Sequence, residues 1–240
     1  MSPSATARPR NRLLAALPSE IFDALAPHLE LVESGMRDVV QHQDQPITSV
    51  HFPETGWFSL LAYMENGDAA EVGLIGREGM LGVPLLLGMK TASLEAMVQG
   101  AGTAWRMDAV EFGRHVERAQ VLRDLLLRYV MVHHEQVART AACNGRHQTT
   151  ERLARWLLMA HDRADGDTFA MTHEFMSMML GIRRAGVTVA AAVLQKAGVI
   201  RYERGSMTIT DRAGLEQASC ECYGLVRRMQ DQLLCEPVEP

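Results

Sequence analysis

The 240-residue sequence lacks any apolar run of membrane length and any start typical of a secreted protein. Its first ten residues are rich in serine, proline and arginine, without the long apolar core of a signal peptide. No later stretch reaches the roughly 20 apolar residues that a membrane helix needs. These absences argue against the secreted and membrane-spanning classes, and we expect a soluble, cytoplasmic protein with no membrane partner.

Cysteine is scarce, and none precedes Cys143. The other three are Cys220, Cys222 and Cys235, and no two pairs have the spacing of a zinc site. We therefore expect four reduced, unconnected thiols and no bound metal. Cys222 has the spacing of a small core residue in a single helix that begins at a capping Asp211 and continues past Ser219.

Histidines are scattered, and no HExxH motif is present. His133 and His134 are adjacent, so they point to different sides of a helix and do not form a metal pair. His42 and His51 are too sparse for the metal centre of a cupin-like enzyme. We predict no catalytic residues, no metal site and no enzyme activity, and we keep the cupin-like metal enzyme as an alternative.

The strongest positive signal is a pair of short helices that meet at Gly181. Thr172 can cap the first helix through its hydroxyl, and Gly181 can end it in the left-handed conformation. Val187 and Leu194 belong to the apolar stripe of the second helix, and Gly198 is its expected terminator. Two short helices joined at a glycine predict a helix-turn-helix.

A predicted hairpin follows the second helix. The turn residues 203–206 separate two short segments that are rich in strand formers and contain Tyr202 and Met207. A helix-turn-helix with such a wing places its second helix in the major groove of double-stranded DNA. The alternative is a module that uses the same surface to bind another protein.

The outer face of the second helix supplies the predicted DNA contacts. Arg184 lies near its N-terminal end, where base contacts are usual, and arginine can bond two acceptors of one guanine. Polar and basic residues farther along the helix and in the wing suit phosphate contacts, which position the protein without reading sequence. The predicted DNA-binding set is Thr172, Arg183, Arg184, Ala185, Gly186, Thr188, Val189, Lys196, Arg204 and Ser206.

Charge supports this assignment only weakly. The net charge is -5, yet residues 146–235 carry 12 basic and 10 acidic side chains, whereas residues 1–145 carry 12 and 17. A local basic face can still bind DNA, and such binding should depend steeply on salt.

The first half of the sequence is predicted to form a β jelly roll. Residues 49–52, 56–61 and 70–75 have the pattern of short strands separated by turn residues, within a strand-rich region from Leu31 to Met107.

The sequence becomes helical from Asp108 to about Cys143. Within that stretch Leu126, Val130, His133 and Val137 recur at steps of four and three, which predicts a parallel homodimer along this helix. The alternative is that the stripe packs on its own barrel. We predict an α+β fold with a sensory jelly roll, a dimerisation helix and a winged helix-turn-helix, at residues 11–112, 113–143 and 146–235.

The order of these parts resembles the Crp-Fnr family of bacterial transcription regulators. The resemblance is most specific in FPETGWFSLL at 52–61, EVGLIGREGMLGVPLLLG at 71–88, and ERLARWLLMA at 151–160 with the helix-turn-helix after it. It implies a cyclic-nucleotide-binding-like jelly roll, a homodimer that binds DNA, and RNA polymerase as a further partner. Arg184 matches the arginine of the family's recognition helix, whereas many members have glutamate and arginine where this chain has Ala185 and Val189. Small apolar side chains can touch a thymine methyl, so a different operator is expected.

The resemblance also bears on the ligand. Gly76, Glu78 and Gly79 partly match the Gly-Glu element that holds the ribose in members that bind cyclic AMP, and they are our candidate ligand pocket. Those members hold the cyclic phosphate with an arginine, but Lys90 is the sole basic residue between Glu78 and Trp105. Members with an iron-sulfur cluster use cysteines in the sensory half, where this chain has none. Haem has no positive support, so we expect no cofactor.

Overall fold

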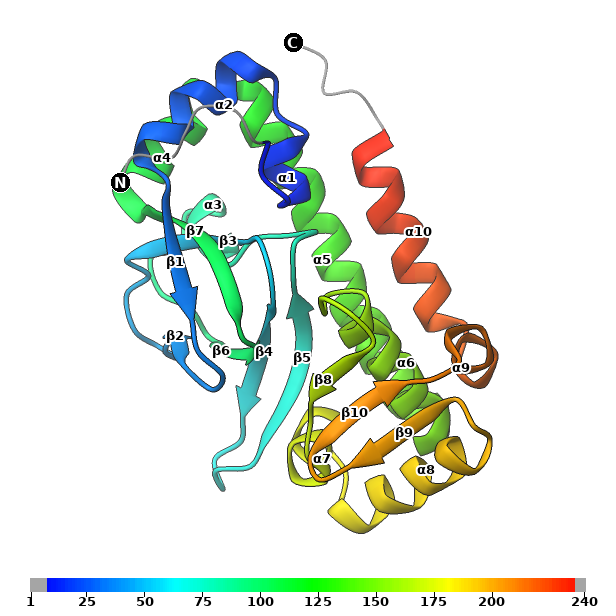
Figure 1. Ribbon diagram of the computed structural model, residues 1–240. Coiled ribbons are helices and arrows are strands. Elements are labelled where there is room, and N and C mark those ends of the chain that lie inside the picture. Colours follow the sequence, from blue (N-terminus) through cyan, green and yellow to red (C-terminus); the bar gives the residue numbers. More distant parts are fainter. Residues whose placement is uncertain (1–7, 236–240) are drawn as a thin grey trace.

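The computed structural model describes residues 8–235, except for the side chains of residues 233–235. Most of the first ten residues, which were examined for a signal peptide, therefore lie outside the described residues, as does the side chain of Cys235. A strand-rich domain comes first, a long helix follows, and a mainly helical domain with a small sheet ends the chain (Figure 1). The predicted α+β class is confirmed.

The N-terminal domain is a barrel of two antiparallel sheets. Residues of both sheets, among them Phe58 and Ala104, share one apolar cluster, so the core lies between the sheets. The strand orders are β1-β7-β3 and β2-β6-β4-β5, and the three strands predicted from the sequence are β3, β4 and β5. The elements of this domain are α1 (Arg12–Ala15), α2 (Ser19–Leu25), η1 (Ala26–His28), β1 (Glu30–Ser34), β2 (Val39–Gln41), β3 (Ser49–Pro53), β4 (Trp57–Tyr63), β5 (Ala69–Ile75), α3 (Val83–Leu86), β6 (Glu95–Gly100) and β7 (Gly102–Asp108).

The predicted helical stretch after the barrel exists, but it consists of two helices. Asp108 caps α4 (Ala109–Arg118) by accepting a hydrogen bond from the Val110 backbone N–H at 2.8 Å. Ala119 has extended backbone angles and separates α4 from α5 (Gln120–Arg146). The predicted barrel limit at residue 112 therefore falls inside α4.

Two residues of the predicted dimer seam instead face the chain's own barrel. Leu126 is 1% exposed and belongs to the barrel core, so it is not available to a partner. The ring of His133 stacks on Tyr129 with ring centres 5.9 Å apart and lies next to Gly73 of β5. Burial lowers the pKa of His133 to about 4, which is typical of a neutral core histidine. For these two positions the alternative interpretation, a stripe that packs on its own barrel, is the right one.

The outward stripe of α5 is displaced by one residue from the predicted one. Val130 and Val137 stay partly exposed, as predicted. Leu127 and His134 take the places predicted for Leu126 and His133 and keep the spacing of three and four residues. The largest exposed apolar side chain of this helix is Met131, at 60%. The half-buried or exposed stripe consists of Leu127, Val130, His134, Val137 and Ala141.

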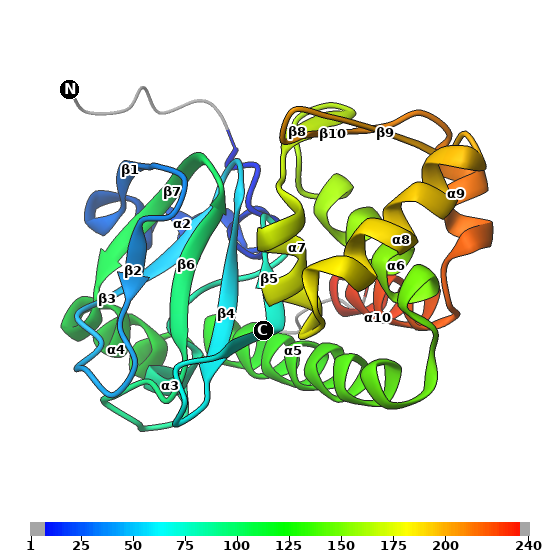
Figure 2. The same ribbon diagram turned by 90° about the horizontal axis from the view of Figure 1, so that it is seen from below.

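The C-terminal domain combines helices with a three-stranded sheet of order β8-β10-β9. The last helix lies alongside α5 in both views (Figures 1 and 2). The elements are α6 (Thr149–His161), β8 (Thr168–Ala170), α7 (His173–Leu180), α8 (Arg184–Lys196), β9 (Ile200–Glu203), β10 (Ser206–Ile209), α9 (Arg212–Ala218) and α10 (Cys222–Cys235).

The single helix predicted from Asp211 is wrong, because the chain forms two helices there. Asp211 does cap α9, since its carboxylate accepts a hydrogen bond from the Gly214 backbone N–H at 3.0 Å. Ser219 then adopts extended backbone angles, φ -86° and ψ 161°, which end α9. This break turns the chain before Cys222 and sets the direction of α10.

Within residues 8–235 no single helix is long and apolar enough to cross a membrane. Helices α7 and α8 reach that length and composition only when taken together, and they are bent by 106°.

Helix α6 joins the two domains through a shared core. Its residues from Arg152 to Ala160 are all buried. Trp57 and Leu74 of the barrel belong to the same apolar cluster as Trp156 of α6 and Met176 of α7. The helix-turn-helix and the barrel therefore fold against each other and bury one continuous apolar surface.

A buried carboxylate lies in this junction. Glu71 of β5 accepts hydrogen bonds from Trp156 Nε1 at 2.7 Å and from Ser59 Oγ at 2.6 Å. Burial raises the pKa of Glu71 to about 7, although both hydrogen bonds act in the opposite direction. Glu71 is thus protonated in the folded chain at a pH where the unfolded chain, with a reference pKa of 4.5, has lost the proton.

This difference predicts how stability depends on pH. Between pH 4.5 and 7 the folded state holds a proton that the unfolded state lacks, so the free energy of unfolding falls as the pH rises. We expect Glu71→Gln to remove about 3 kcal/mol of that fall, measured by denaturant unfolding at pH 5 and pH 8 with tryptophan fluorescence. The exposed Glu33→Gln is the matched control and should keep the wild-type pH dependence. Equal pH dependence in all three proteins would contradict the assignment.

Candidate nucleic-acid interface

The two helices of the predicted helix-turn-helix are present with the expected cap and turn. The Thr172 hydroxyl accepts a hydrogen bond from the Phe175 backbone N–H at 3.1 Å and so caps α7. Gly181 has φ +60° and ends the helix in the left-handed region. Helices α7 and α8 then meet at 106°, within the range of DNA-binding helix-turn-helix units.

Helix α8 has a buried side and an outward side. Val187 and Leu194 are buried in the shared core, as predicted from their spacing. The outward side carries two strongly exposed apolar residues, Val189 at 66% and Val193 at 51%, and the sequence analysis missed the second. The predicted residues that the structure places in exposed positions on or beside α8 are Arg183, Arg184, Ala185, Thr188, Val189 and Lys196.

The predicted wing is confirmed as the hairpin of β9 and β10. Arg204 and Gly205 both have positive φ, +50° and +80°, which is typical of the tight type I′ turn. Arg204 is exposed at the tip, and Ser206 is half-buried at the start of β10. Strand β8 adds a third strand that the sequence analysis did not predict.

A small cluster that the sequence analysis missed joins α7, α8 and the wing. The His173 ring stacks on Tyr202 with ring centres 4.4 Å apart, and its Nδ1 lies 3.0 Å from Thr188 Oγ1. Burial and the charge of Arg184 lower the pKa of His173, which favours the neutral ring. The Gln195 side-chain oxygen accepts a hydrogen bond from the Tyr202 backbone N–H at 2.8 Å. These contacts hold the wing against α8, so that the two exposed surfaces keep a fixed relation.

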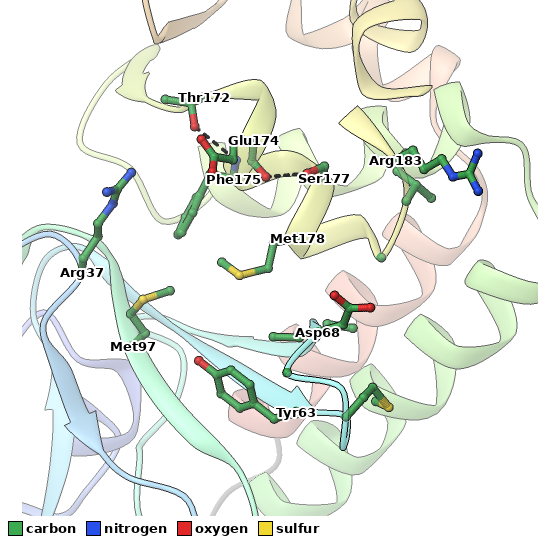
Figure 3. Close-up of a pocket in the computed structure, with 16 residues that line it drawn as sticks. Arg37, Tyr63, Asp68, Met97, Thr172, Glu174, Phe175, Ser177, Met178 and Arg183 are labelled. Carbon is green, nitrogen blue, oxygen red and sulfur yellow. Dashed lines mark hydrogen bonds between the residues drawn. The ribbon is translucent and has the colours of Figure 1, made fainter. Parts of the chain in front are cut away.

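Thr172 differs from the other predicted DNA contacts because it lines a cleft between the domains. The cleft has a volume of about 890 Å³ and lies between α7 and the β4–β5 hairpin (Figure 3). Tyr63 and Met97 come from the barrel side, and Phe175 and Met178 come from α7. The guanidinium of Arg37 also lies 6.0 Å from the centre of the Phe175 ring. The hydroxyl of Thr172 is used for capping, so its predicted DNA contact has less geometric support than those on α8.

Gly186 is not required for packing within the chain. A Cβ atom there would meet Ile182 Cδ1 at 3.6 Å, which is an ordinary contact. Packing on α7 therefore does not account for this glycine, and its place in the DNA-binding set stays a prediction.

Side chains of the chain itself pack closely around the two glycines of the predicted ligand pocket, whose ligand-binding role stays a prediction. A Cβ atom on Gly76 would lie 2.6 Å from Arg163 Cγ, and one on Gly79 would lie 2.3 Å from the Tyr129 hydroxyl. Glu78 accepts a hydrogen bond from Arg163 Nε at 2.9 Å, and both side chains are nearly buried. The glycines thus make room for these two side chains, which reach the turn from α5 and from the residues after α6.

The histidines weighed for a cupin-like centre lie apart from any metal-type group in the described part of the chain. His51 is buried, and burial lowers its pKa to about 4. His42 is exposed and lies 3.8 Å from Glu95. His42 and His51 therefore give no geometric support to a cupin-like metal centre.

Cys143, Cys220 and Cys222 are free thiols, as expected, but they lie together rather than apart. Cys143 Sγ and Cys220 Sγ lie 3.5 Å apart, and Cys222 belongs to the same buried cluster. The fold brings them together because α10 returns along α5, a long-range contact that linear spacing does not reveal.

Two family models match the chain, one in each of its two domains. Residues 32–119 match the cyclic nucleotide-binding domain, and residues 151–218 match the Crp-like helix-turn-helix domain. No curated protein matches the chain by sequence.

Several solved structures share the fold at low identity. FixK2 from Bradyrhizobium japonicum has a TM-score of 0.68 and 15% identity over 80% of this chain and 98% of its own. A CRP-family transcriptional regulator from Thermus thermophilus has a TM-score of 0.65 and 16% identity over 80% of this chain and 96% of its own. The c-di-GMP-responsive global regulator CLP of Xanthomonas campestris has a TM-score of 0.61 and 13% identity over 80% of this chain and 99% of its own.

The left-handed turn at Gly181 predicts a measurable loss of stability on substitution. Alanine there meets nothing closer than Ala70 Cβ at 3.8 Å, so its cost comes from the backbone alone. We expect Gly181→Ala to lower the free energy of unfolding by about 1–2 kcal/mol. The control is Gly113→Ala inside α4, where a Cβ atom has open space and should add about 0.5–1 kcal/mol. Denaturant unfolding measures both, and a neutral Gly181→Ala would show that the turn relaxes.

Proposed function

The chain belongs to the Crp-Fnr family of helix-turn-helix transcription regulators, and on this premise we propose that it binds a specific sequence of double-stranded DNA as a homodimer. The observation that carries the proposal is the outward side of α8. It combines two arginines at the N-terminal end with exposed Val189 and Val193, and the wing is held beside it. An exposed apolar strip next to arginines suits the edge of base pairs in a major groove.

Base and phosphate contacts divide along this surface. Arg184 is exposed on the first turn of α8 and is proposed to bond guanine, while Val189 lies about one turn later and suits a thymine methyl. Lys196 at the end of α8 and Arg204 at the wing tip are proposed phosphate contacts. The operator would therefore differ from that of relatives with glutamate and arginine on this helix.

The proposed dimer forms along the outward stripe of α5. Val130 and Val137 occupy alternate positions of that stripe, Met131 lies beside them, and all three are accessible in the single chain. Two such helices in parallel would place two copies of α8 on successive turns of the duplex, about 34 Å apart.

No cyclic nucleotide is proposed as the effector. A ribose at the Gly76 turn would have to displace the buried Arg163 from Glu78, and the sequence between Glu78 and Trp105 offers no arginine for the phosphate. Contact with RNA polymerase and a cytoplasmic location follow from the family and are part of the proposal. The protein-interaction and metal-enzyme alternatives lack an observation that favours them.

The first test removes the proposed base contact. Arg184→Ala should weaken binding to the operator by roughly 5- to 150-fold, because one bidentate base contact contributes about 1–3 kcal/mol, and should relax the preference at one base pair. The operator is first found by selection from random DNA, and binding is then measured at several salt concentrations. Arg114→Ala, which removes the same charge from the exposed surface of α4, is the control and should bind as wild type. Unchanged affinity and sequence preference in Arg184→Ala would contradict the base contact.

The second test addresses the dimer. Met131→Asp places a charge directly beside the proposed seam and should convert the dimer, about twice the 26.6 kDa chain mass, into monomers in analytical ultracentrifugation. Val110→Asp is the matched control, because Val110 is equally exposed at 62% but lies on α4, outside the stripe. A dimer that tolerates Asp at Met131 would exclude this seam, and a monomeric wild type would exclude the dimer.

A further inference from the structure

Four side chains with metal-binding atoms converge where the long helix passes into the helix-turn-helix domain. Cys143 lies in the last turn of α5, and His147 is the residue directly after that helix. Cys220 lies on the segment that links α9 to α10, and Cys222 is the first residue of α10. The ligand atoms of all four lie within 4.8 Å of one another, and the three thiols are buried.

We propose that Cys143, His147, Cys220 and Cys222 form a structural site for one zinc ion. Zinc in structural sites takes four ligands, commonly three cysteines and one histidine, in a tetrahedron. Sulfur atoms that share a tetrahedral zinc with bonds of about 2.3 Å are about 3.8 Å apart. The observed separations are 3.5 Å for Cys143 Sγ to Cys220 Sγ and 3.9 Å for Cys222 Sγ to His147 Nδ1.

The histidine is oriented as a metal ligand needs. Its Nδ1 faces Cys222, while its Nε2 lies 3.2 Å from a carboxylate oxygen of Glu221. A carboxylate that accepts a hydrogen bond from Nε2–H leaves the lone pair of Nδ1 available for a metal. This carboxylate-histidine-metal arrangement is a usual feature of zinc sites, and it gives Glu221 the role of orienting His147.

Buried positive charge next to the cluster suits an anionic zinc site. Three thiolates and a neutral histidine around Zn²⁺ carry a net charge of -1, and binding releases the thiol protons to solvent. Arg155 is 4% exposed, and its charge acts on Cys143 and Cys222. The Nε atoms of Arg152 and Arg155 have no hydrogen-bond partner among the described residues, so the anion would compensate a charge that is otherwise costly to bury.

An occupied site would cross-link the end of α5 to the start of α10. It would also fix one of the two residues between α5 and α6, because His147 is one of the ligands. The DNA-binding domain would then be tied to the long helix by coordination bonds in addition to apolar packing.

The test measures metal binding by the full-length chain and needs no DNA, so its outcome is independent of the proposed function. Reduced protein is stripped with a chelator and titrated with Co²⁺ as a coloured probe and then with Zn²⁺. We expect one metal per chain, intense tetrahedral Co²⁺ bands with thiolate-to-metal charge transfer, loss of those bands when Zn²⁺ displaces Co²⁺, and a higher unfolding temperature with Zn²⁺.

Variants separate a metal site from a merely packed cluster. Cys220→Ser should abolish the thiolate-to-cobalt spectrum of the wild type, and Glu221→Gln, which keeps all four ligands, should weaken zinc binding by about 10- to 100-fold. Cys235→Ser is the matched control and should bind as wild type, because Cys235 ends α10, about 20 Å along the helix from Cys222. Absence of metal uptake, a cobalt spectrum unaffected by Cys220→Ser, or a Cys143–Cys220 disulfide whose reduction restores no metal binding would overturn the proposal.

Discussion

The burial of α6 on all sides is the constraint on which the rest of this structure depends. An amphipathic helix needs one partner, but a helix that buries nine successive residues needs apolar neighbours all around it. Here the barrel supplies Trp57 and Leu74, and helices α7, α8, α9 and α10 supply further contacts. Because no one neighbour covers α6, the barrel and the helix-turn-helix share one core. The sides of α7 and α8 that pack against α6 must be apolar. The outward side of α8 makes no contact with this core, so its residues are free of that requirement.

Local patterns in the sequence predicted the parts of the fold that local physics decides. Thr172, Gly181 and the turn at Arg204 were assigned correctly, because capping and positive φ depend on a few neighbouring residues. The same holds for the stripe of α8, whose spacing matches a helix with one buried side. Strand β8 was missed because it has only three residues, and pairing with β10 defines it rather than its own composition.

Long-range packing decided what the sequence could not. The spacing of Leu126 and His133 is that of a seam, but it does not reveal that the barrel covers this side of α5 and leaves the side one residue later open. In the same way, the linear spacing of Cys143 and Cys220 gives no sign that α10 returns along α5 and brings the two thiols together. The one available sign of the break between α9 and α10 was Ser219, a weak helix former that directly precedes Cys220.

The buried pair of Glu78 and Arg163 links the barrel turn to the residues that follow α6. Each charge is stable in the interior only because the other is present, and a chain that lost one would keep the other buried without compensation. Chains descended from a common ancestor with this one should therefore keep both residues or replace both. A relative that holds a ribose at this turn would have to lack the pair, so two positions far apart in the sequence together decide whether the turn is open to a ligand.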